Sequence, residues 1–184
     1  MSAERPASSI GLHAGPAVGF EAPFEMLEAC HQRVHRMLDL LERLATHLGS
    51  HGADEPARQA ARDVMRYFDQ AGPAHHEDEE RHVLPRLRAA HHGALADRLH
   101  ADHEAMARAW ALVRADLQAV ADGGWQRAAQ SAADVRWVAF AVLYREHIRA
   151  EEAEAYPAAR DGLDAALEQA MGREMAARRG VTAA

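Results

Sequence analysis

The stretch HHEDEERHVLP at residues 75–85 carries the pattern His-x3-Glu-Glu-x4-Pro. The same pattern returns in HIRAEEAEAYP at residues 147–157, displaced by 72 positions (147 minus 75), and this displacement also carries His31 onto His103. Histidine makes up 13 of the 184 residues, so one match would mean little. Both histidine pairs, both Glu-Glu dipeptides and both prolines match at one displacement. The repeat therefore predicts a shared site, built from His31, His75, Glu79, His103, His147 and Glu151.

The composition limits the class of protein. Hydrophobic content is 48% but aromatic content only 5%, a balance typical of a helical bundle with a core of small aliphatic residues. The net charge of −7 argues against a nucleic-acid-binding surface, and the single cysteine, Cys30, excludes an internal disulfide. We find neither an apolar run of transmembrane length nor the charged-then-apolar pattern of a secretion signal. We therefore expect a soluble, cytoplasmic protein that binds neither nucleic acid nor membrane.

Apolar residues at three- and four-residue spacing predict an all-α fold, an antiparallel up-down four-helix bundle with an additional C-terminal helix. The predicted helices cover residues 21–48, 54–85, 95–120, 131–157 and 163–178, with a kink at Gly72-Pro73. Residues 1–20 are expected to form a flexible tail, 21–160 the bundle, and 161–184 the last helix and its own tail. The last helix is expected either to cover the bundle or to pair with a second chain, which would give a homodimer. Arg178 and Arg179 near its end suit the helix dipole.

Helix geometry brings the six residues of the repeat together. His75 and Glu79 point from one face of a helix, about 6 Å apart along its axis, and so do His147 and Glu151. In an antiparallel bundle the two other helices each supply one inward histidine, so four imidazoles and two carboxylates meet in the core. Such a set suits Fe, Mn or Zn, and a carboxylate at the axis can bridge two ions about 3.5–4 Å apart.

With these two motifs and the lone histidine on each alternate helix, the chain resembles the hemerythrin-like, HHE cation-binding family over about residues 21–160. The resemblance implies a four-helix bundle with an oxo- or hydroxo-bridged di-iron centre. Carried over, it places His31 with His147 on one iron and His75 with His103 on the other, with both glutamates bridging. Oxygen-carrying hemerythrins have a histidine at the position of Glu79, and this difference argues against a carrier.

Three functions follow from the resemblance. The first is a di-iron protein that binds a small diatomic ligand, O2 or NO, for sensing, storage or stress protection. The second is a di-iron enzyme in NO or peroxide detoxification or in repair of iron–sulfur centres. The third is a metal-storage or regulatory module. The sequence identifies no catalytic residue and does not separate these alternatives.

Residues beside the six ligands are weaker candidates. His76, Glu77, Glu80, Glu104 and Glu152 are candidates for hydrogen bonds to the ligand imidazoles, although a solvated face is the more frequent arrangement. Gly72 and Tyr144 occupy equivalent positions, one turn before His75 and His147. They are a candidate ligand pocket, in which Gly72 leaves a hollow and Tyr144 directs its hydroxyl toward a ligand. The simpler interpretation is that Gly72 eases the kink and that Tyr144 is ordinary core.

Overall fold

The computed structural model describes residues 19–181, and every regular element within this range is helical. The elements are α1 (Pro23–His51), α2 (Glu55–His82), α3 (Leu84–Ala89), α4 (Gly93–Ala121), the 3-10 turn η1 (Arg127–Ala129), α5 (Gln130–Ala150), the π-helical turn η2 (Glu151–Ala155), α6 (Tyr156–Arg160) and α7 (Ala165–Arg178). None of these helices is long and apolar enough to span a membrane.

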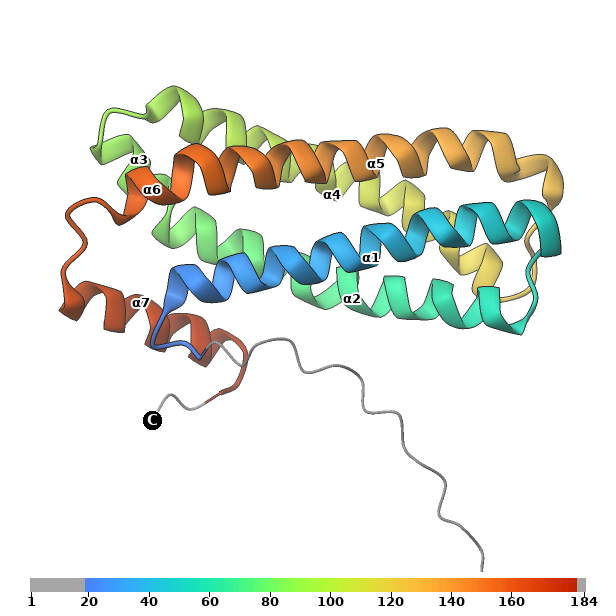
Figure 1. Cartoon of the computed structure of the whole chain (residues 1–184), viewed down its shortest axis with the longest axis horizontal. Helices are drawn as coiled ribbons and strands as arrows, with labels where there is room; N and C mark the ends of the chain where they lie inside the picture. Colours follow the sequence, from blue (N-terminus) through green and yellow to red (C-terminus); the bar gives the residue numbers. More distant parts are fainter. Residues whose placement is uncertain (1–18, 182–184) are drawn as a thin grey trace, which may run out of the picture.

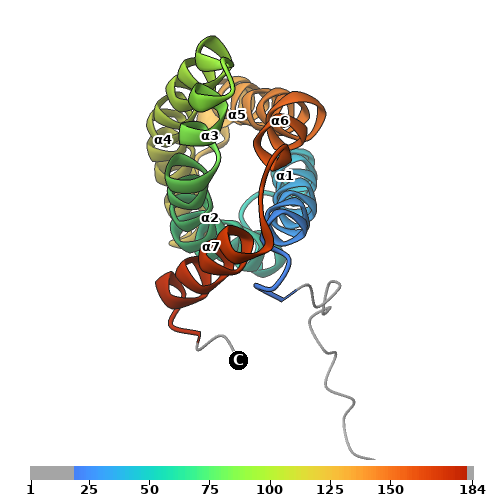
Figure 2. The same ribbon diagram turned by 90° about the vertical axis from the view of Figure 1, so that its left-hand side faces the viewer.

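Four long helices, α1, α2, α4 and α5, form an antiparallel bundle (Figure 1). Each packs against two neighbours, and α5 returns to lie beside α1, which closes the ring seen end-on in Figure 2. The predicted apolar stripes face inward, with Leu38 and Leu41 of α1 and Leu117 of α4 almost completely buried. The expected four-helix bundle with an additional C-terminal helix is confirmed.

The connections follow local turn chemistry. Asp54 caps α2 where the predicted helix begins, its side chain accepting the backbone N–H of Ala57 at 3.0 Å. The first helix ends at His51, three residues past the predicted end at residue 48 and just before Gly52, whose φ of 73° favours glycine. The end of α4 is as predicted, with Gly123 at φ 75°.

The three prolines of the motif region behave differently from one another. Pro73 lies inside α2, which continues through it as one helix. At Pro85 the chain changes helix, because α2 ends at His82 and Pro85 occupies the first turn of α3, where a missing N–H costs little. Pro157 was expected to be an equivalent break. Instead the helical run passes through η2 directly into α6, with Pro157 in its first turn.

Two apolar clusters fill the core, one toward each end of the bundle. The larger contains, among others, Val34, Leu38, Phe68, Met106, Phe140 and Tyr144. The smaller contains, among others, Phe24, Leu27, Cys30, Leu84, Leu99, Tyr156, Met171 and Met175. Along each long helix, the candidate ligands lie between the residues of one cluster and those of the other, so the polar layer is closed off by apolar side chains at both ends.

Helix α7 covers α1 and α2 (Figure 2). It buries Met171 and Met175 in the smaller cluster, and it pairs with the fully buried carboxylate of Asp78 through Arg178 and Arg179, each at 2.6 Å. Arg178 lies in the last turn of α7, as the helix-dipole argument expected, and the ion pairing adds a second role for both arginines, because a buried carboxylate requires a close positive charge. The homodimer through this helix stays a prediction.

Most of the expected N-terminal tail, residues 1–18, lies outside the described residues. Phe20, the last residue assigned to the tail, packs against the smaller cluster, and the guanidinium of Arg179 lies 5.7 Å from its ring centre.

Candidate metal centre

All six residues predicted from the repeat converge in the middle of the bundle. Each of the four long helices contributes one histidine, α2 adds Glu79, and the π-turn η2 adds Glu151. All six residues are buried, with none more than 6% exposed. Their donor atoms form two overlapping groups in which all atoms lie within 4.8 Å of one another.

The first half of the centre contains His31 and His75. Their Nε2 atoms lie 3.1 Å apart. His31 Nε2 is 3.2 Å from Glu151 Oε2, and His75 Nε2 is 3.2 Å from Glu79 Oε1. These four residues form one of the two groups that can hold a metal ion.

The second half contains His103 and His147, whose Nε2 atoms also lie 3.1 Å apart. His103 Nε2 is 3.4 Å from Glu79 Oε2, and His147 Nε2 is 2.9 Å from Glu151 Oε1. Both glutamates therefore face both halves, one oxygen to each, which is the arrangement of a bridging carboxylate.

The histidine pairing differs from the one that the resemblance implied. His31 is grouped with His75 and His103 with His147, so each half is built across one pair of sequential long helices, α1 with α2 and α4 with α5. The order of the helices around the bundle allows both histidine pairings, because α1 also contacts α5 and α2 contacts α4. The spacing of the repeat does not decide between them, whereas the donor atoms in the structure do.

The second glutamate of each motif orients a histidine on a neighbouring helix. The Nδ1–H of His31 donates to Glu152 at 2.9 Å, and that of His103 donates to Glu80 at 3.0 Å. These two contacts are themselves related by the displacement of 72 positions. A carboxylate behind a ligand imidazole fixes the tautomer that leaves Nε2 free to bind a metal. Glu80 and Glu152 thus contact the centre, whereas Glu104 faces His100 and Arg108.

The remaining two histidines are supported unequally. The Nδ1–H of His147 donates to Asp102 at 3.4 Å. The position equivalent to Asp102 is Cys30, and the Nδ1 atom of His75 has no hydrogen-bond partner among the described residues. In the second half, the ring of His76 also stacks on His103, with centroids 4.2 Å apart.

The two buried carboxylates of Glu79 and Glu151 require positive charge close to them. Burial opposes the charged form of His75, but the Glu79 carboxylate beside it more than offsets burial and raises its pKa well above the ordinary value. The pKa of His147 is raised in the same way, against burial, by Glu151. Burial alone would raise the pKa of Glu79, yet His75 and His103 hold it well below its usual range. Imidazolium protons thus balance the buried carboxylates, and metal cations at the same atoms would do so too.

The donor set fits a pair of metal ions. Glu79 Oε2 and both carboxylate oxygens of Glu151 are buried without a hydrogen-bond partner among the described residues. Leaving a buried carboxylate oxygen unpaired is costly, and a metal ion satisfies it. Imidazole nitrogens and carboxylate oxygens together suit iron, manganese or zinc.

Tyr156 also reaches the centre, although sequence reasoning did not identify it. Its hydroxyl donates to Glu79 Oε1 at 2.5 Å and lies 3.1 Å from His31 Nε2. Burial, followed by Glu151 and Glu79, raises the pKa of this phenol well above its usual range. On a regular α-helix, the residue five positions after Glu151 would face elsewhere. Only the neighbouring Pro157, which lacks the N–H that a regular helix needs there, hints at an irregular turn.

The proposed pocket residues Gly72 and Tyr144 lie against each other. A Cβ atom at position 72 would be 3.5 Å from the Tyr144 hydroxyl oxygen, so this hydroxyl fills the space that glycine leaves. Tyr144 stacks on His76, which in turn stacks on His103. The pair therefore borders the second half of the centre.

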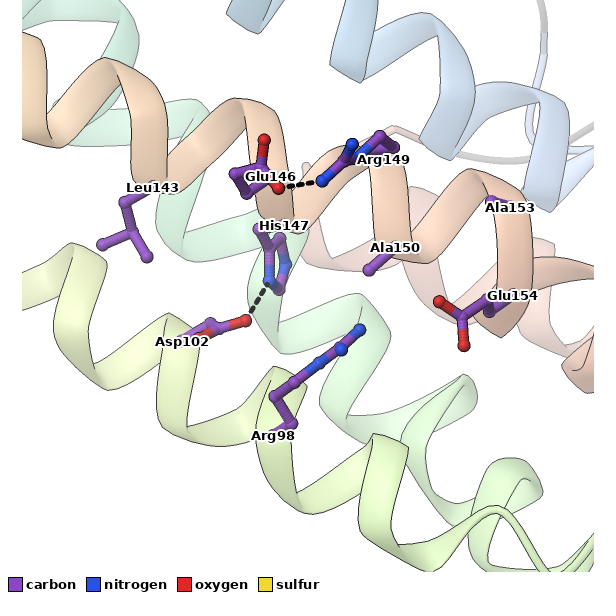
Figure 3. A pocket seen from close by; sticks show the side chains of 9 residues that line it. All are labelled: Arg98, Asp102, Leu143, Glu146, His147, Arg149, Ala150, Ala153 and Glu154. Carbon is purple, nitrogen blue, oxygen red and sulfur yellow. Dashed lines mark hydrogen bonds and ion pairs between the residues drawn. The ribbon is translucent and has the colours of Figure 1, made fainter.

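A cleft of about 380 Å³ opens toward the second half from the side where α4 faces α5 (Figure 3). His147 lies at its inner wall with the Asp102 contact beside it, and Arg98 points from α4 across the opening. Helix α7 packs against α1 and α2, the helices that supply the histidines of the first half.

The sequence matches the family described as the Hemerythrin HHE cation binding domain over residues 22–159. It is also 30% identical over 161 residues to a protein of Haemophilus influenzae that is described only as uncharacterized. That alignment spans 86% of this chain and 91% of the relative. With the buried His/Glu groups and the helical bundle already in place, these matches show that the chain belongs to the hemerythrin HHE cation-binding family.

Proposed function

We propose that this protein holds two metal ions, iron in the first place, and binds a small diatomic ligand, O2 or NO, at this centre for sensing, storage or stress protection. One observation carries the proposal. Two His2Glu2 groups share both glutamates, and each carboxylate turns one oxygen to each group. Manganese and zinc suit the same donors, so metal identity is part of the test.

The residues of the chain would each do a definite task. His31 and His75 would hold one ion, His103 and His147 the other, and Glu79 and Glu151 would bridge them. Glu152 and Glu80 hold the imidazoles of His31 and His103 in the tautomer that can bind a metal. When bound, two iron ions supply the coordination positions and the electrons that a diatomic ligand requires. The apolar clusters above and below exclude bulk water, and this protects such a complex from side reactions.

Metal analysis and an optical spectrum of the protein as purified provide the first test. We expect two metal ions per chain. A chain that binds no metal after anaerobic reconstitution with Fe(II) contradicts the proposal. Uptake of many iron atoms per chain would instead indicate storage.

Mixing the reduced, iron-loaded protein anaerobically with stoichiometric O2 or NO separates the two remaining functions. A long-lived, reversible complex supports ligand binding. Repeated turnover with release of product identifies a di-iron enzyme, and the cleft beside His147 gives that alternative a route for a reactant larger than a diatomic molecule.

A further inference from the structure

The two halves of the centre do not present the same number of donor atoms. The second half has four, the Nε2 atoms of its two histidines and one oxygen from each glutamate. The first half has the equivalent four and also the hydroxyl oxygen of Tyr156, within 3.1 Å of His31 Nε2 and 2.5 Å of Glu79 Oε1. The position equivalent to Tyr156 is Leu84, which lies in the smaller apolar cluster and brings no donor.

The spacing of the candidate donors around His31 Nε2 matches one coordination shell. Donors about 2.1 Å from a shared metal ion, at right angles to one another, lie about 3.0 Å apart. His31 Nε2 is 3.1 Å from His75 Nε2, 3.2 Å from Glu151 Oε2 and 3.1 Å from the Tyr156 hydroxyl. The phenol oxygen thus stands in the same relation to His31 as the two other candidate donors do.

The π-turn η2 explains how Tyr156 reaches this position. In η2 the backbone N–H of Tyr156 bonds to the carbonyl of Glu151, five residues back, so the two side chains share a face. In α2 the equivalent bond runs from Val83 to Glu79, four residues back, and Leu84 turns into the apolar cluster. The repeat is thus broken by one local change of helix type, at a functional site where π-turns are often found.

The ring of Tyr156 is held firmly in place. It stacks on the imidazole of His31, with centroids 5.5 Å apart and planes 11° apart, and it packs edge-on against Phe24. Tyr156 is 1% exposed. A phenylalanine at this position would keep both ring contacts and lose only the oxygen, so the oxygen can be tested separately from the packing.

We propose that the phenol oxygen of Tyr156 is a fifth protein donor to the metal ion of the first half, which makes the second half the position with open coordination. The inference rests on the two-metal centre proposed above. On binding of Fe(III) the hydroxyl proton leaves to solvent, as for other ligands that bind a metal without their proton. The cleft at His147 leads to the same half that this count of donors leaves open.

The test uses protein loaded with two Fe(III) ions per chain. Phenolate bound to Fe(III) absorbs visible light by charge transfer, and resonance Raman excitation in that band shows tyrosine ring vibrations. The chain has three tyrosines, so Tyr67→Phe and Tyr144→Phe are matched controls for Tyr156→Phe. We expect the band in the wild type and both controls, and its loss in Tyr156→Phe with two irons retained.

A second measurement needs no variant and so does not depend on whether a variant folds. Wild-type protein produced with ring-deuterated tyrosine should show the same Raman ring vibrations at shifted frequencies. Two bound irons without a tyrosine-dependent band would overturn the inference and leave the two-metal centre intact, with Tyr156 as a hydrogen-bond donor to Glu79 only. Persistence of the band in Tyr156→Phe would overturn it as well. A failure to bind iron at all would instead contradict the proposed function.

Azide binding tests whether the metal ion of the second half is the one with an open coordination position. The wild type should bind one azide per di-iron centre, at the second half, and Tyr156→Phe should gain a second site. If the wild type and Tyr156→Phe each bound one azide with the same affinity, the proposal that the first half has one more protein donor than the second would be contradicted.

Discussion

The two halves of the centre are built from one repeated motif and share one outer glutamate contact each, yet the rest of their surroundings differ. Each half has two histidines 3.1 Å apart and one oxygen from each glutamate. The first half adds Tyr156 and has Cys30 beside His75, on the side covered by α7. The second half has Asp102 and His76 around its histidines, and it faces the cleft. In the proposed two-metal centre, the six shared ligands would hold the ions, and the unequal surroundings would decide which ion an outside molecule reaches.

The largest effect should come from removing a shared ligand. Glu151→Ala takes one donor from each half, so we expect loss of both ions, whereas His75→Ala should lose mainly the ion of the first half. Removing one partner of a buried charged group also costs about 3–5 kcal/mol of stability. Metal analysis and thermal unfolding of the two variants provide the measurement. Two ions retained at full affinity in both variants would disprove the ligand assignment.

A smaller and equal effect should follow from the two outer glutamates. Because Glu80 and Glu152 make the same contact in opposite halves, each alanine variant should weaken metal binding by roughly 10- to 100-fold. Competition with a coloured chelator measures both affinities. Glu104→Ala is the control, since Glu104 adjoins a ligand in sequence but contacts His100 and Arg108. A marked difference in metal affinity between the Glu80→Ala and Glu152→Ala variants would show that the two halves also differ in these outer contacts.

The Asp102 and Cys30 positions should respond unequally. Asp102→Ala removes the acceptor behind His147 and should weaken the second ion by roughly 10-fold, the lower end of effects for such contacts. Cys30→Ala removes no hydrogen bond to the free Nδ1 atom of His75 and should leave metal affinity nearly unchanged. The chelator competition that serves for the glutamates measures this pair too. Equal losses in both variants would mean that the thiol supports His75 as the carboxylate supports His147.

The smallest effect concerns ligand approach. Tyr144→Phe removes one hydroxyl near the second half and should shorten the lifetime of an O2 or NO complex by roughly 2- to 10-fold, the equivalent of about 0.5–1.5 kcal/mol. Gly72→Leu would displace that hydroxyl, only 3.5 Å from a Cβ at position 72, and should slow ligand association with iron content kept. Stopped-flow rates unchanged in both variants would rule out this approach path.

The sequence was sufficient for the regular part of this molecule. The stripe through Leu27, His31 and Val34 has the helical period, and the 72-residue displacement brought together residues that lie on four helices. The apolar stripe and the repeat are both patterns of spacing along the chain, and such spacing can be read from the sequence alone. They predicted the bundle and the buried positions of the six residues, whereas the sharing of both glutamates was implied by the family resemblance.

What the sequence did not predict depends on contacts between distant elements and on local irregularity. The spacing of the repeat does not show that His31 is grouped with His75 rather than with His147. Tyr156 reaches the centre only because η2 adds a residue to one turn. The buried charge of Asp78 depends on Arg178 and Arg179, one hundred positions away, which no short-range pattern connects.

Anomalous diffraction at the iron edge from crystals of the reconstituted protein tests the central claim most directly. We predict two peaks about 3.5–4 Å apart. One should be bound by His31, His75 and Tyr156, the other by His103 and His147, with Glu79 and Glu151 shared. A single peak, or two peaks that pair His31 with His147 and His75 with His103, would contradict the account.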